Sequence, residues 1–172
     1  MIRTGGRLWT LGVDQAATSG WCLHEGTTPR AWGEAKTARE RRDAVALAAR
    51  LSGCNNTCST QSWFTFVFEN HAGFFAKNGR GHAALMGALY RWHEQLDLID
   101  HPEDFRMGLT PDQWQTRVLG LKKRTIKRAE RKAQARFWAS AHVQERITSE
   151  DVADAIAISA CGAMLCAGRF VR

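Results

Sequence analysis

The sequence of 172 residues has no run of apolar residues long enough to cross a membrane, which takes about 18 in succession. Its first residues contain no apolar core of the secretory kind, so we expect an intracellular protein. There is no internal repeat, low-complexity tract or linker, and the length suits one folded domain over 1–172. These absences favour an ordinary globular protein.

Cysteines are few, and their number is odd. Five cysteines in an intracellular chain argue against a disulfide framework. Cys54 and Cys58 have the spacing of half a zinc site, but no second pair completes it, so we interpret both as ordinary thiols. The chain also lacks any Ser/His/Asp or Cys/His spacing typical of a covalent nucleophile. No organic cofactor is indicated either.

Positive charge is unevenly distributed in a chain of net charge +7. From 147 to 168 there is no lysine or arginine, whereas 122–136 holds a dense basic segment with Glu130 as its only acid. Such a segment favours a polyanionic partner over a merely solvated helix face, where charges of both signs usually alternate. Its basic residues are Lys122, Lys123, Arg124, Lys127, Arg128, Arg131, Lys132 and Arg136.

The pattern of apolar residues predicts an α/β fold with a mixed central sheet of about five strands flanked by helices. The strands are expected at 8–13, 20–23, 31–33, 63–68 and 105–109. Helices are expected at 38–51, 82–98, from Pro111, through the basic segment, and from a cap at Thr148-Ser149 to about Cys166.

For two of these helices, the sequence also predicts which side is buried. In the first, we expect Val45, Ala48, Ala49 and Leu51 to be buried and Arg39, Arg41 and Arg42 to be exposed. In the basic segment, the spacing predicts a buried stripe beneath a cationic face, made of Ile126, Ala129, Ala133 and Phe137.

Acidic residues end two of the apolar strands, and two more share one face of the last helix. Asp14 and Glu69 follow runs that look buried, and Asp151 and Asp154 lie three residues apart. Three of these acids have an ordinary explanation when taken alone: a helix-dipole partner worth about 0.3–1 kcal/mol for Asp151, a turn or cap for Asp14, and a lysine pair for Glu69. Asp154 lies deeper in the helix, where the dipole explanation is weaker. Together they predict a site for Mg²⁺, with Mn²⁺ as a substitute, because hard carboxylate oxygens suit these ions and two ions can drive phosphodiester hydrolysis.

The same residues resemble a known family. Leu11-Gly12-Val13-Asp14 with Thr18-Ser19-Gly20-Trp21, then Phe66-Val67-Phe68-Glu69, and finally Asp151-Val152-Ala153-Asp154, are similar to the motifs of RuvC-type Holliday junction resolvases, which have a ribonuclease H-like fold. The motifs occur in the family's order from about 8 to 166. The resemblance implies a junction-resolving endodeoxyribonuclease with two metal ions per site, working as a homodimer on branched DNA in the cytoplasm of a bacterium or a phage-infected host.

By this resemblance the metal-binding catalytic acids are Asp14, Glu69, Asp151 and Asp154. An aromatic wedge for the open junction falls on Phe74 or Phe75, because the preceding loop is longer than usual. Lys132 matches a position near the scissile phosphate and Lys77 a backbone contact. The remaining DNA-binding candidates come from the basic segment: Lys123, Lys127, Arg128 and Arg131.

Asp14-Gln15-Ala16 stands where the family usually has Asp-Pro-Gly, and the basic segment contains more lysine and arginine than is expected of a cellular resolvase. Both features resemble phage or viral members. Three other interpretations compete with this one. An actin-like kinase half would need glycines after Asp14 and a second lobe, and the chain has neither. A nuclease of the same fold could act on flaps, forks or RNA–DNA hybrids, and a non-catalytic DNA-binding module would gain nothing from four acids that repel phosphates.

Overall fold

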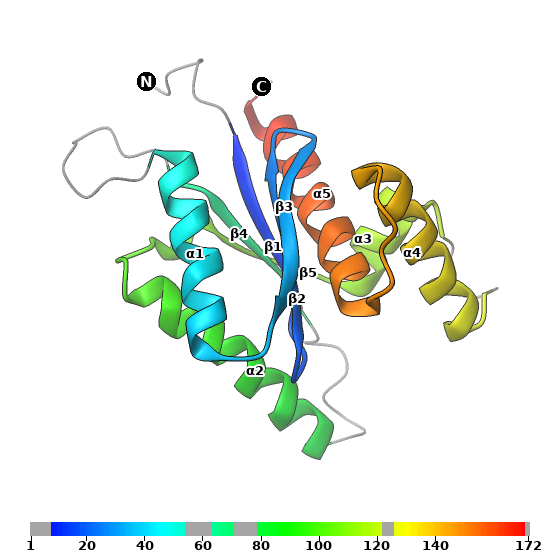
Figure 1. The fold of residues 1–172 in the computed structure, drawn as a ribbon, viewed down its shortest axis with the longest axis horizontal. Helices are drawn as coiled ribbons and strands as arrows, with labels where there is room; N and C mark the ends of the chain where they lie inside the picture. The colour runs from blue at the N-terminus through cyan, green and yellow to red at the C-terminus, as the bar shows by residue number, and fades with distance from the viewer. Residues whose placement is uncertain (1–7, 54–62, 71–78, 122–125, 171–172) are drawn as a thin grey trace.

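The computed structural model describes residues 8–53, 63–70, 79–121 and 126–170. It confirms the predicted α/β architecture with one mixed five-stranded sheet, in the order β3-β2-β1-β4-β5 (Figure 1). β1 pairs with β2 and β2 with β3 in antiparallel fashion, whereas β4 is parallel to both β1 and β5. The strands are β1 Trp9–Asp14, β2 Ser19–Glu25, β3 Thr28–Ala35, β4 Thr65–Glu69 and β5 Arg106–Leu109.

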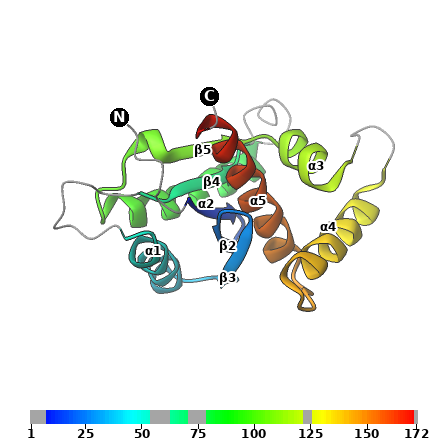
Figure 2. The same ribbon diagram turned by 90° about the horizontal axis from the view of Figure 1, so that it is seen from above.

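Helices cover both faces of this sheet, as Figure 2 shows from above. α1 and α2 pack on one face, where Phe66 and Trp92 are fully buried in the shared core. α3, α4 and α5 pack on the other, where Ile156 and Ile158 of α5 are fully buried. The helices are α1 Ala38–Ser52, α2 Gly79–Asp97, α3 Pro111–Leu119, α4 Arg128–Val143 and α5 Glu150–Phe170, with a 3-10 turn at Glu103–Phe105.

Local sequence signals explain where several helices begin and end. Thr37 and Thr110 each form a capping box, with Glu40 and Gln113 respectively, before α1 and α3. Pro111 opens α3 as predicted, at a position where its missing N–H costs nothing. Ser149 accepts a hydrogen bond from the Val152 amide at 3.4 Å, so the predicted cap of the last helix is confirmed.

Both predicted helix faces need correction. In α1, Arg41 is buried and Leu51 is 41% exposed, because the inward face follows Arg41, Ala44, Val45 and Ala48. In α4, Phe137 is 79% exposed and Ala129 and Ala133 are exposed too. The buried positions of α4 are instead Ala135 and Ala139, which face α5 and the sheet, with Trp138 packed beside them.

α5 is the most apolar of the helices that the structure describes. By length and hydropathy the part from Glu150 to Gly168 could cross a membrane, but 72% of that window is buried inside the protein. α5 is therefore a core helix packed against the sheet, and this packing fixes where the acids near its beginning lie.

Candidate active site

The register of two parallel strands brings two acids together. β1 and β4 pair in parallel with Val13 beside Phe68, so the next residue on each strand, Asp14 and Glu69, comes at the same edge of the sheet. Both side chains are buried, with exposed fractions of 9% and 8%. Carboxyl ends of neighbouring parallel strands are where α/β proteins usually build their sites.

Close backbone contacts place the beginning of α5 over this edge. Gly20 pairs with Asp14 across β1 and β2, and a Cβ on Gly20 would lie 1.9 Å from the Asp151 carbonyl oxygen. Further along, a Cβ on Gly12 would lie 2.5 Å from Cα of Ser159. Only glycine permits such contact, so these two positions hold α5 against the sheet with Asp151 and Asp154 beside the strand ends.

The acids influence one another strongly. Burial, then the carboxylates of Asp154 and Glu69, raise the pKa of Asp14 well above its usual value. Burial and Asp154 likewise raise the pKa of Glu69 to about 7. Because a pKa rises when the charged form is poorly stabilised, the raised values mean that the surroundings do not fully stabilise these carboxylates in their ionised form.

Among the described residues, Lys132 of α4 brings positive charge into the acid cluster. Its ammonium donates to Oδ2 of Asp154, and it lowers the pKa values of Asp14 and Glu69 as well as that of Asp154. Burial, the largest single influence on Lys132, would lower its pKa, but the carboxylates of Asp154, Asp14 and Glu150 together outweigh burial and raise the pKa. Burial dominates at Asp154, whose pKa stays above the usual value. Its Oδ1 is buried without a hydrogen-bond partner.

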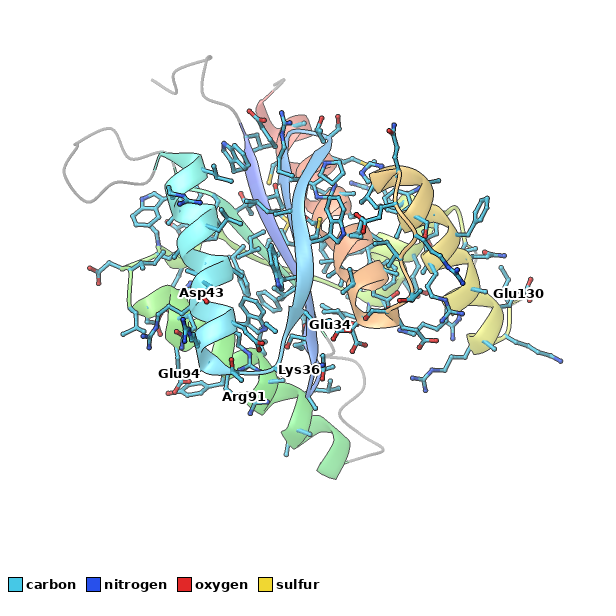
Figure 3. The ribbon with its side chains drawn as sticks, in the orientation of Figure 1. Glu34, Lys36, Asp43, Arg91, Glu94 and Glu130 are labelled. Carbon is cyan, nitrogen blue, oxygen red and sulfur yellow. The ribbon has the colours of Figure 1, made fainter. Side chains whose placement is uncertain are left out.

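Asp151 lies at the outer side of the cluster and is only half buried. Burial raises its pKa, Lys132 opposes this, and Glu34 and Glu150 add to it. Glu34, at the end of β3, lies between that strand and the start of α5 (Figure 3), where a hydrogen bond with Ser149 lowers its pKa. Arg136 pairs with Glu150 at 2.7 Å, so α4 contacts the acidic beginning of α5 twice.

The donor set fits a divalent cation in its chemistry. Buried carboxylates of raised pKa and the unpartnered Oδ1 of Asp154 are the environment that a hard cation would stabilise. Among the described residues, however, no three His, Cys, Asp or Glu side chains are grouped closely enough to hold an ion. The cluster as it stands contains the Lys132 ammonium instead.

The DNA-binding candidates divide into two groups. Lys127 and Arg128 are exposed at the beginning of α4, and Arg131, partly buried, donates to Gln115 at 3.5 Å. Glu130, the one acid of the basic segment, lies on the outer side of α4, away from the acid cluster (Figure 3). Four candidates lie outside the described residues: Phe74, Phe75, Lys77 and Lys123. The same holds for Cys54 and Cys58.

Two buried polar contacts were not expected from the sequence. The Gln15 side chain binds the backbone of Glu69, and His24 lies between Ser159 and His142. The sequence gives no signal for the histidine contacts, since His24 and Ser159 are 135 residues apart. For Gln15 the sequence showed only that it directly follows Asp14, and nothing in it indicated the contact with Glu69, 54 residues away.

Comparison with solved structures identifies the architecture. T. thermophilus RuvC, in a structure described as a complex with Holliday junction substrate, superposes with a TM-score of 0.63 at 15% identity, covering 94% of this chain and 96% of the other. The chain has the fold of RuvC. At this level of identity the similarity establishes the RuvC-like fold alone. No protein-family model matches the sequence, and no curated protein matches it.

Proposed function

We propose that this protein is a structure-selective, metal-dependent endodeoxyribonuclease that resolves four-way DNA junctions by paired phosphodiester hydrolysis. The observation that carries the proposal is the convergence of buried acids from β1, β4 and α5 at one edge of a RuvC-like fold, with mutually raised pKa values. A structural role for such a cluster is costly, since like charges in a buried site destabilise the fold.

Asp14, Glu69, Asp151 and Asp154 would hold two Mg²⁺ ions, with Mn²⁺ able to substitute. When bound, such ions activate a water and stabilise the leaving oxygen of a phosphodiester. The chain's own contribution is to bring four carboxylates to the same edge of the sheet and to bury three of them, Asp14, Glu69 and Asp154.

Lys132 and the beginning of α4 would serve the phosphate backbone. The Lys132 ammonium is tied to Asp154, so a phosphate held beside the acids lies within its reach. Lys127 and Arg128 are exposed one turn earlier on the same helix and can neutralise neighbouring phosphates. Contacts of this kind read shape and backbone rather than base sequence.

Junction DNA is the substrate we propose because the RuvC that superposes on this chain is described in complex with a Holliday junction. Two opposed strands of a junction must be cut, which requires two sites, so we propose a homodimer. Flaps, forks and RNA–DNA hybrids are the alternative substrates, since the same acids would serve them equally.

The test is cleavage of an immobile four-way junction with Mg²⁺, beside duplex, flap and RNA–DNA hybrid substrates. We expect paired symmetric nicks in the junction. Asp14→Asn should lower the rate more than about 100-fold, because even residues behind metal ligands cost about 10 to 100-fold. Asp43→Asn is the matched control, since Asp43 is exposed on α1 (Figure 3).

Each other outcome has a definite meaning. Preferred cleavage of flaps or hybrids would keep the metal chemistry and replace the substrate. An equal loss of cleavage rate in Asp14→Asn and Asp43→Asn would show that Asp14 is not part of the active site. No metal-dependent cleavage of any substrate would refute the enzyme and leave a DNA-binding module.

A further inference from the structure

The side chain of Gln15 joins the ends of the two central strands. Gln15 follows Asp14 directly, is 2% exposed, and reaches across to Glu69 of β4, 54 residues away. Its Nε2 donates to the Glu69 carbonyl oxygen, and its Oε1 accepts from the Glu69 amide at 3.2 Å. One side chain therefore satisfies both backbone groups of a single residue.

This pairing continues the sheet where the backbone ladder stops. The register between β1 and β4 ends with Val13 beside Phe68, one residue before the acids. On the other side, the Asn70 amide donates to the Leu109 carbonyl at 2.7 Å. The backbone at Glu69 is thus held from both neighbouring strands. A primary amide carries a donor and an acceptor together, and only asparagine and glutamine have one; asparagine is one methylene shorter.

We infer that Gln15 is a positioning residue, whose amide fixes the backbone of Glu69 so that its carboxylate and that of Asp14 face the same bound cation. The inference rests on the proposed function. Gln15 itself touches no reacting group: its two amide atoms are both used on the Glu69 backbone. A fixed backbone sets the direction of Cα–Cβ, and metal ligands held in place by such contacts bind more tightly than free ones.

The consequence is local to Glu69. Without the amide, the end of β4 keeps its contact with β5 but loses the one with β1, so Glu69 can move relative to Asp14. Metal affinity should fall, while the surfaces that bind DNA should be unaffected. The fold should survive, because the rest of the β1–β4 ladder does not involve Gln15.

The test is Mn²⁺ binding, measured by the electron paramagnetic resonance of free Mn²⁺, in wild type, Gln15→Met and Gln95→Met. Methionine keeps the length of glutamine without its hydrogen bonds. Gln95 is the matched control: it is 6% exposed on α2 and its Oε1 accepts from Arg42 at 3.4 Å, away from the acids. We expect Gln15→Met to weaken Mn²⁺ binding by about 10 to 100-fold and Gln95→Met to leave it unchanged.

Two further measurements separate positioning from a general loss of stability. Hydrogen exchange of the Glu69 amide should be much faster in Gln15→Met, with other β4 amides unchanged. In a Glu69→Gln background, Gln15→Met should cost less than about twofold in Mn²⁺ affinity, since a residue that acts through Glu69 has nothing left to position. Junction binding in EDTA should be the same in wild type and Gln15→Met.

Mn²⁺ affinity of Gln15→Met within about twofold of wild type would overturn the inference and leave the proposed function intact. An equal loss in the Glu69→Gln background would also overturn it. If Gln15→Met does not fold, Gln15→Asn, which keeps the amide but cannot reach, must show the same loss of affinity. If wild type itself binds no Mn²⁺ and cleaves nothing, the proposed function fails, and this inference fails with it.

Discussion

Replacing Glu69 by glutamine should stabilise the metal-free protein at pH 8 and change its stability little at pH 4.5. Burial and Asp154 raise the pKa of Glu69 from 4.5 to about 7. A carboxyl group whose pKa is higher in the folded protein than in the unfolded chain makes the fold less stable as pH rises through that window. The difference between 4.5 and about 7 corresponds to about 3 kcal/mol.

The assay is urea unfolding in EDTA at pH 4.5, 6 and 8, followed by circular dichroism. Wild type should lose about 1 to 3 kcal/mol of stability between pH 4.5 and 8 relative to Glu69→Gln. Glu94→Gln, an exposed change on α2 (Figure 3), should follow wild type. Added Mg²⁺ should stabilise wild type at pH 8 more than it stabilises Glu69→Gln. A pH dependence that is the same in wild type and Glu69→Gln would refute the reasoning.

Two other substitutions test how the acids are held. Lys132→Met should destabilise the metal-free protein by about 2 to 4 kcal/mol at pH 8, because Asp154 loses its buried partner. At pH 8 the lysine, whose pKa is raised, is fully charged, so the whole contribution of the ion pair is present. Lys36→Met, at the exposed pair with Glu34, should cost under about 0.5 kcal/mol in the same urea assay. Gly20→Ala should lower the stability by about 3 kcal/mol and remove most of the cleavage activity, since the new Cβ would meet the Asp151 carbonyl. Gly81→Ala, where nothing lies within 4 Å of the new Cβ, should be neutral or stabilising. Equal effects of the two substitutions on thermal unfolding would contradict the close packing of α5.

The sequence predicted the parts of the fold that depend on local pattern. Strands that end in Asp14 and Glu69 were placed within two residues, and the cap at Ser149 was correct. Apolar runs and caps are properties of consecutive residues, so they can be found without tertiary structure. That these acids share one edge followed from the rule for parallel strands, and their catalytic role stays a prediction.

The errors arose where two interpretations had equal local support. α4 carries one apolar stripe through Ala129, Ala133 and Phe137 and another through Ala135 and Ala139, and only packing against α5 decides between them. Arg41 is buried because α1 turns that side inward, although arginine is rarely buried without a partner carboxylate. Gln15 could not be assigned, because its partner lies 54 residues away.

The position of α5 has a consequence for how such a protein can change. The helix that fills the middle of one core layer also carries Asp151 and Asp154, so these acids are placed by the folding of the whole domain rather than by a separable loop. The site is therefore not modular: it cannot be grafted onto another scaffold as a short segment, nor adjusted by loop exchange. Under the proposed function, adaptation to a different DNA shape would have to come from exposed residues at the periphery, such as Lys127 and Arg128 at the beginning of α4, which do not contact the acids.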